Sequence, residues 1–377
     1  MNLCSAWLAP IKDQLPTDFS GQDAAAFGAA LNQEALSRLE NFIAGVRTYQ
    51  TFPVARETAQ TMPVVWQKGT TKLLDYAPSS TGSALLVVPS LINRFDILDI
   101  DCDRSFLRFL AESGFHPFVV DWGTVGPEEQ SFTIADYITE RVLPALDFVR
   151  EKQEGKPVHL AGYCMGGVFA MAAALMQPKA VRSLTLLATP WDFSAGVAGV
   201  PGIGTPLGRL FMQQATGMHD YLEKVGILPA SFLQSVFALF QPVRILEKFM
   251  AFSSVAPETS SARRFVLTED WLNDGVPLAF SVAQECLHDW YGKNLTAQNK
   301  WHVGDFLIDP TKLAMPTFVL AAKKDKIVPL ESTLPLSKLI PVVTLHAPEM
   351  GHIGLMASDD APKKVWTPLM VWLRALS

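Results

Sequence analysis

The stretch at residues 158–167, VHLAGYCMGG, places a cysteine between two glycines directly after an apolar run. Gly162 and Gly166 flank Cys164 in a Gly-x-Cys-x-Gly pattern, and a strong helix former, VFAMAAALM, follows. A nucleophile on a tight strand-to-helix turn needs such glycines, because neighbouring backbone passes too close for a Cβ. The N-terminus of the helix favours thiolate over thiol. We therefore expect Cys164 to be a nucleophile; the alternative is a small structural residue in a glycine-rich turn.

A thiolate nucleophile needs a base, and the base needs a group that orients it. In enzymes with such a turn, an acid and then a histidine follow the nucleophile along the chain. Asp325 ends the run VLAAKKD, and His352 follows the next apolar run in HAPEMGHIG. We expect Asp325 to accept a hydrogen bond from Nδ1 of His352, and Nε2 of His352 to take the proton of Cys164. Taken singly, the aspartate could be a turn former and the histidine a solvated side chain.

The remaining histidines compete poorly for the role of base. His159 lies within the predicted strand before the cysteine turn, and His116 precedes an early predicted strand. His288 and His302 lie in a predicted lid.

Acyl transfer passes through a tetrahedral intermediate whose oxyanion needs two hydrogen-bond donors. The N–H of Met165, directly after the nucleophile, is the expected first donor. The second is expected from the loop after the apolar run ALLVVPS, hence the N–H of Ser90 or Leu91. Asn93 in the same loop either orients it or caps a turn.

Short apolar runs alternate with helix-like segments through much of the chain, which predicts a mostly parallel sheet covered on both faces. The expected strands are residues 84–90, 116–123, 157–162, 183–190, 317–325 and 341–349. The fold class is therefore α/β, with a doubly wound sheet.

The alternation is interrupted by a glycine- and proline-rich stretch and then by long aromatic, helix-like sequence. We expect three parts: an N-terminal helical segment over residues 1–60, a core over 61–194 and 306–377, and a helical lid or cap over 195–305. The lid aromatics could cover an apolar chain, or they could be plain core; they are Phe232, Phe237, Phe240, Phe249, Phe252, Trp271 and Trp290.

Composition excludes several classes of protein. The net charge of −6 and the lack of a basic cluster argue against nucleic-acid binding. No apolar run is long enough for a transmembrane helix, and the first residues lack the features of a signal peptide. The four cysteines are widely spaced, which favours a reducing cytoplasm, and no metal-ligand spacing is found among cysteines and histidines.

Six motifs follow one another along the chain and can be compared with known families as a set. They are VPSLINRFDILDIDCDRSFLRFL, GFHPFVVDWG, LAGYCMGG, LLATPWDF, AAKKDKIVP and GHIG. Together they resemble the polyhydroxyalkanoate synthases, cysteine acyltransferases of the α/β-hydrolase fold, and the chain is similar in size to their short catalytic subunit. The resemblance implies that Cys164, Asp325 and His352 are the catalytic residues. It also implies a 3-hydroxyacyl-CoA substrate, a growing polyester, no cofactor, a possible accessory subunit, a homodimer, and a cytoplasmic location that could include the surface of polyester granules.

Other functions remain open at this point. Lys326 stands where many synthases have a histidine after the aspartate, so a diverged member could be a thioesterase or a hydrolase of polyester oligomers. Dienelactone hydrolases share the Gly-Tyr-Cys-x-Gly-Gly pattern but are shorter and lack a comparable lid. A scaffold protein without activity is the remaining alternative.

Overall fold

The computed structural model describes residues 21–53, 62–195, 219–240 and 242–377. The chain forms two compact units, one of residues 1–53 with 242–262 and the other of residues 54–241 with 263–377. The predicted lid, residues 195–305, is therefore divided between the two units. The glycine- and proline-rich stretch that was expected to open the lid lies largely outside the described residues.

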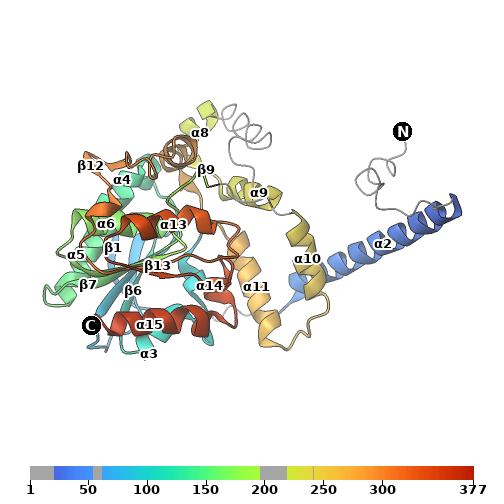
Figure 1. Cartoon of the computed structure of the whole chain (residues 1–377), viewed down its shortest axis with the longest axis horizontal. Helices are drawn as coiled ribbons and strands as arrows, with labels where there is room; N and C mark the ends of the chain where they lie inside the picture. Colours follow the sequence, from blue (N-terminus) through green and yellow to red (C-terminus); the bar gives the residue numbers. More distant parts are fainter. Residues whose placement is uncertain (1–20, 54–61, 196–218, 241) are drawn as a thin grey trace. The chain divides into compact units, whose positions relative to one another are not determined.

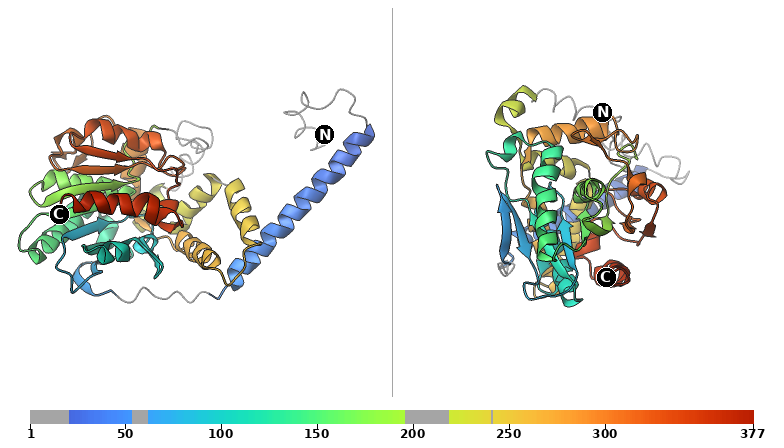
Figure 2. Two further views of the ribbon diagram at one scale, coloured as in Figure 1. Left: turned by 60° about the horizontal axis from the view of Figure 1, so that its bottom comes forward. Right: turned by 90° about the vertical axis from the view of Figure 1, so that its left-hand side faces the viewer.

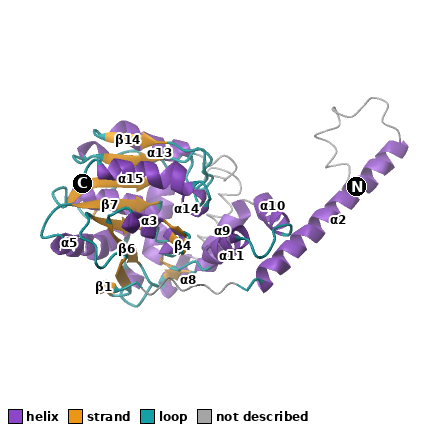
Figure 3. Ribbon diagram, turned by 90° about the horizontal axis from the view of Figure 1, so that it is seen from below, coloured by secondary structure: helices purple, strands orange, loops and turns teal. Residues whose placement is uncertain are grey.

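The larger unit is built on an eight-stranded sheet in the order β1-β2-β6-β3-β7-β8-β13-β14. Neighbouring strands from β6 to β14 run parallel. Strands β1 and β2 form an antiparallel hairpin, and β2 pairs antiparallel with the edge of β6 that faces away from β3. Figure 3 shows the strands side by side. Their bounds are β1 Val64–Lys68, β2 Thr71–Asp75, β3 Ala84–Val88, β6 His116–Asp121, β7 Val158–Tyr163, β8 Val181–Leu187, β13 Thr317–Leu320 and β14 Val343–His346.

All six expected strands are present, so the α/β class and the mostly parallel sheet are confirmed. The hairpin β1–β2 was not expected. Strand β1, Val64–Lys68, has only three apolar residues followed by two polar ones. An antiparallel strand at a sheet edge can have one face exposed to solvent, so it lacks the long apolar run by which the other strands were predicted.

Helices cover both faces of this sheet (Figures 1 and 2). Strand β3 shows why, because alternate residues point to opposite faces: Leu86 and Val88 join one buried cluster, and Leu85 and Val87 join the other. The helices of the first cluster are α4 Ile134–Tyr137, α5 Leu143–Lys152, α6 Met165–Met176 and α13 Leu330–Leu339. Those of the second are α3 Phe106–Glu112, α14 Gly354–Ala357 and α15 Thr367–Arg374.

The rest of the larger unit is mostly lid sequence. Its elements are α8 His219–Val225, β9 Ile227–Leu228, α9 Ala230–Phe240, α11 Ser260–Asn273, β10 Leu278–Ala279, α12 Phe280–Glu285, a π-helical stretch Cys286–Gly292, β11 His302–Val303 and β12 Phe306–Leu307. A small hairpin, β4 Asp99–Asp101 with β5 Arg104–Ser105, follows the 3₁₀ turn Phe95–Leu98 in the core.

The smaller unit consists of α2 Gly21–Thr51 and α10 Pro242–Phe252, which pack against each other (Figure 1). Gly45 permits the close approach, because a Cβ there would lie 1.9 Å from the carbonyl oxygen of Phe249. The ring of Phe249 packs edge-on against Phe42 and Tyr49 of α2. Phe249 therefore serves as core in this unit rather than as lining for a substrate chain.

Candidate active site

Cys164 lies on the turn between β7 and α6, as the sequence predicted. Its backbone has φ 55° and ψ −125°, a conformation that residues with a side chain rarely adopt. The neighbouring strand holds this turn, since the N–H of Cys164 donates to the carbonyl oxygen of Leu187 at 2.8 Å. The side chain of Cys164 is partly exposed, so a reactant has access to it.

The two glycines beside the cysteine are required by close backbone approach. Val88 of β3 pairs with Gly162 of β7, which brings the end of β3 against the start of α6. A Cβ on Gly166 would lie 2.1 Å from the oxygen of Val88, and a Cβ on Gly162 would lie 2.4 Å from the oxygen of Gly166. Backbone atoms fixed in a sheet and a helix cannot move aside cheaply, so no other residue fits at either position.

We expect Gly166→Ala to destabilise the protein by about 3 kcal/mol or more, because the methyl group forces β3 and α6 apart. Urea unfolding followed by circular dichroism measures the effect. Gly354→Ala is the matched control, since its Cβ would meet only ordinary contact at 3.9 Å, and it should change stability by less than about 1 kcal/mol. Equal effects of the two substitutions would contradict this account of the turn.

Asp325 and His352 follow the ends of β13 and β14, which are adjacent parallel strands. Their side chains meet, with 2.7 Å between Nδ1 of His352 and Oδ2 of Asp325. The other carboxylate oxygen accepts from the N–H groups of Ile327 and Val328, each at 2.8 Å. Both side chains are buried, so the aspartate is held rigidly and presents one oxygen to the imidazole.

The third member of this cluster is Cys164, which lies near enough to His352 for its charge to raise the pKa of the imidazole. Burial alone would lower the pKa of His352, but the charges of Asp325 and Cys164 and the hydrogen bond to Asp325 raise it to about 10. An imidazolium beside a thiolate is the arrangement that lower-pKa cysteines use as nucleophiles. The structure thus brings together the three residues that the sequence singled out, one from each of three strand ends.

Tyr163 is a residue of this site that sequence reasoning missed. Its hydroxyl donates to the backbone oxygen of His352 at 3.2 Å, and its ring centroid lies 5.1 Å from that of the imidazole. The side chain is buried and fixes the loop that carries His352. Its place directly before Cys164 was the available signal, but a contact with a residue so distant in the chain could not be read from it.

The expected oxyanion donors lie at the start of α6 and on the loop after β3, the strand that pairs with β7. Met165 begins α6, where its N–H has no acceptor within the helix. Within the described part of the chain, the N–H groups of Ser90 and Leu91 also donate to no acceptor. Asn93 forms a single antiparallel bridge with Gly275 through the backbone, a contact with lid sequence that neither expectation for Asn93 included.

The other histidines have structural partners. His159 is buried with Nδ1 2.7 Å from the hydroxyl oxygen of Ser183, and burial and the charge of Arg182 lower its pKa to about 4. His116 pairs with Asp75 at 2.8 Å. Both lie in the first two residues of their strands, whereas Cys164 follows a strand end, so neither competes with His352.

Two of the aromatic lid residues belong to the core. Trp290 is buried and stacks on Phe193, and Trp271 is buried as well. Tyr291, next to Trp290, packs edge-on against Phe193 and is exposed. The side chains of Phe237 and Phe240 lie outside the described residues.

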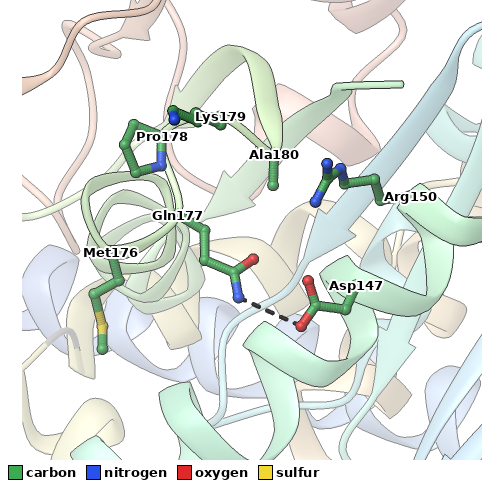
Figure 4. Close-up of a pocket in the computed structure, with 7 residues that line it drawn as sticks. All are labelled: Asp147, Arg150, Met176, Gln177, Pro178, Lys179 and Ala180. Atoms are coloured by element: carbon green, nitrogen blue, oxygen red, sulfur yellow. Dashed lines mark hydrogen bonds between the residues drawn. The ribbon is translucent and has the colours of Figure 1, made fainter. Parts of the chain in front are cut away.

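A surface hollow lies far from this site. It is formed where α5 and α6 end, and Figure 4 shows Gln177 reaching Asp147 across it, at 3.4 Å. Cys164 stands at the opposite end of the twelve-residue helix α6, roughly 18 Å away. The hollow is therefore not part of the candidate active site.

Comparison with known proteins agrees with the geometry. A family model described as "alpha/beta hydrolase fold" matches residues 84–358, and one described as "Poly-beta-hydroxybutyrate polymerase (PhaC) N-terminus" matches residues 23–110. A poly(3-hydroxyalkanoate) polymerase subunit PhaC from Haloferax mediterranei is 30% identical over 82% of this chain. The chain belongs to the α/β-hydrolase superfamily, and within it the chain is similar to the polyhydroxyalkanoate synthases.

The synthase relatives differ in how much of their length the chain spans. It covers 63% of the Haloferax mediterranei protein but 82% of the polymerase subunit PhaC from Allochromatium vinosum, to which it is 27% identical over 79% of its own length. Among solved structures, a monoacylglycerol lipase from Paleococcus ferrophilus has a TM-score of 0.51 at 13% identity. That match covers 81% of this chain and 99% of the lipase, and it shows a shared fold. In the described part of the chain, every helix is too short or too polar to cross a membrane.

Proposed function

We propose that the chain is an acyltransferase that polymerises 3-hydroxyacyl-CoA into polyester and releases coenzyme A. The observation that carries this proposal is the arrangement of the partly exposed Cys164 with the buried His352 and Asp325 at the ends of three strands. The similarity to the synthases supports the choice of acyl donor and acceptor, since the relatives are named as polymerases.

In the first step, the thiolate of Cys164 attacks the carbonyl carbon of the CoA thioester. A bond forms between Sγ and the acyl carbon, and the bond from that carbon to the sulfur of CoA breaks. The imidazolium of His352 gives its proton to the departing CoA thiolate. Because nucleophile and leaving group are both thiolates, the exchange is close to balanced in energy.

In the second step, neutral His352 takes the proton of a 3-hydroxyl group, and the hydroxyl oxygen attacks the acyl carbon on Cys164. An ester bond forms, the bond to Sγ breaks, and the thiolate is restored beside the imidazolium. Asp325 holds Nδ1–H throughout, which keeps Nε2 directed at the cysteine. The N–H groups of Met165 and of Ser90 or Leu91 are the proposed oxyanion donors, and Gly162 and Gly166 keep the turn in place.

The finer features of the reaction are part of the same proposal. The match to the N-terminal family model of poly-beta-hydroxybutyrate polymerases makes 3-hydroxybutyryl-CoA the first substrate to try. Relatives described as a subunit support the addition of an accessory protein to the assay, and a homodimer is expected from the family resemblance. The proposed chemistry requires no cofactor. The growing polyester would place the enzyme at a granule surface in the cytoplasm.

The test is incubation with 3-hydroxybutyryl-CoA, with and without an accessory synthase subunit, while CoA release and product form are followed. Insoluble polyester is the expected product. Free 3-hydroxybutyrate without polymer under both conditions would replace the proposal with a thioesterase. Absence of CoA release under both conditions would contradict acyl transfer from this substrate.

A further inference from the structure

The loop that offers the second oxyanion donor is held differently at its two ends. At its start, directly after β3, the indole N–H of Trp122 donates to the carbonyl oxygen of Pro89 at 3.2 Å. The side chain of Leu91 is buried in the core. This end is therefore fixed by the sheet and by α6.

The far end of the loop is fixed by residues 271–275, which we call the clamp segment. Three contacts of different kinds join the two. The indole N–H of Trp271 donates to the backbone oxygen of Arg94 at 2.7 Å, and Nε of Arg94 lies 3.1 Å from the carboxylate of Asp274. Asn93 and Gly275 form the backbone bridge already described.

The clamp segment is itself braced. Trp271 is buried in the cluster of side chains on the α3 and α15 face of the sheet. The side-chain amide of Gln234 in α9 donates to the backbone oxygens of Leu272 and Asn273, at 3.3 and 2.7 Å. The segment therefore connects the loop to lid sequence as well as to the core.

We propose that Trp271 and Asp274 are positioning residues for acyl transfer, which hold the loop of residues 90–94 so that its N–H faces the oxyanion. The inference rests on the proposed reaction at Cys164. Neither residue touches the reacting atoms; each acts through Arg94. Removing one oxyanion donor from a hydrolase costs about 10²–10³ in rate, and a displacement of about 1 Å costs about 10². Loosening the loop should therefore slow the acylation of Cys164.

Stability and catalysis should separate in this segment. The side chains of Arg94 and Asp274 are 36% and 41% exposed, and an ion pair of that kind contributes little to folding. Asp274→Asn should leave the unfolding midpoint almost unchanged and still lower the rate. Trp271→Phe keeps the ring in the core but leaves the oxygen of Arg94 without its donor.

Two acyl donors are used in the experiment, 3-hydroxybutyryl-CoA and p-nitrophenyl acetate, with alkylation of Cys164 by iodoacetamide as the reference reaction. Alkylation needs the thiolate but no oxyanion donor. We expect Asp274→Asn and Trp271→Phe each to lower the acylation rate by about 10-fold, and the double variant by about 100-fold, at a nearly unchanged KM. Alkylation should stay within about twofold of the unaltered protein.

The matched control is Glu140→Gln, which removes an ion pair of similar exposure with Lys68 on the far hairpin of the sheet. It should change neither rate.

Full acylation in the double variant would overturn the inference. An equal loss of acylation and alkylation would also overturn it, because that result indicates general disorder of the site. If the unaltered protein reacts with p-nitrophenyl acetate but not with the CoA thioester, the proposed substrate fails while the positioning role is still measured on the ester. Reaction with neither donor overturns both proposals.

Discussion

Replacing Cys164 by alanine is expected to abolish acyl transfer, lowering the rate by about 10⁴-fold or more, because no other group on the strand ends can form the covalent thioester. Cys164→Ser should lose nearly as much. A hydroxyl group is not ionised by a neighbouring imidazole in the resting state, and an alkoxide exchanges less readily with a thioester. CoA release from 3-hydroxybutyryl-CoA measures both variants.

The side chain of Cys164 is partly exposed, so its removal leaves no large cavity. The alanine variant should therefore unfold at nearly the same urea concentration as the unaltered protein. Cys102→Ser is the control, because Cys102 is an exposed cysteine outside the cluster, and it should keep full activity. An active Cys164→Ala protein would show that another residue carries the acyl group.

Replacing Asp325 by asparagine is expected to lower acyl transfer by about 10³–10⁴-fold while the fold is kept. Asparagine can still accept from the N–H groups of Ile327 and Val328 through its oxygen. Its amide nitrogen then faces Nδ1 of His352, which forces the proton onto Nε2. In that tautomer the imidazole cannot accept a proton from Cys164 or from a substrate hydroxyl.

Asp309→Asn is a matched control for this substitution. The carboxylate of Asp309 accepts from the N–H and the hydroxyl of Thr311, at 3.0 and 2.7 Å, in a similar turn that lies outside the cluster of Cys164, His352 and Asp325. It should affect stability to a similar small degree and leave the rate unchanged. A fully active Asp325→Asn protein would remove Asp325 from the mechanism.

The alkylation of Cys164 tests its coupling to His352. The charges of Asp325 and Cys164 raise the pKa of His352, so its imidazolium persists through neutral pH beside the sulfur. Iodoacetamide should therefore react with Cys164 more slowly at pH 7 in His352→Gln than in the unaltered protein, because the positive charge is lost. An equal rate in this variant would show that His352 does not assist the cysteine.

The raised pKa also links folding to pH, with a definite sign. An unfolded histidine has a pKa near 6.5, and His352 binds its proton more tightly in the folded state. The stabilisation is therefore fully present below pH 6.5 and is lost as the pH rises through about 10. The urea midpoint of the unaltered protein should therefore decrease between pH 6 and pH 10. The decrease should be smaller in His352→Gln, which lacks the titrating group.

The sequence was most informative where a feature is local. Strands could be found from short apolar runs, and the carboxyl ends of parallel strands share one edge of the sheet, so residues after β7, β13 and β14 were expected to meet. Gly162 and Gly166 marked the sharp turn because the Gly-x-Cys-x-Gly pattern is local in the sequence. Asp325 and His352 needed only their order along the chain and their places after strands.

What the sequence could not reveal depends on contacts between distant segments. Trp271 and Arg94 are joined by one hydrogen bond across a separation of 177 residues, and no spacing rule connects them. The packing of α10 against α2 is of the same kind, because it depends on Gly45 and Phe249 meeting. The aromatic lid residues were ambiguous for a related reason, since apolar helical spacing is equally typical of core and of substrate lining.

The central claim is that Cys164 carries the growing acyl chain, and the most direct test is the mass of the intact protein. After brief mixing with 3-hydroxybutyryl-CoA and quenching in acid, the protein should gain the mass of a hydroxybutyryl group. Proteolysis should place the group on the peptide that contains Cys164, and Cys164→Ala should gain nothing. Release of CoA without any adduct on Cys164, or an adduct that persists in Cys164→Ala, would contradict the account.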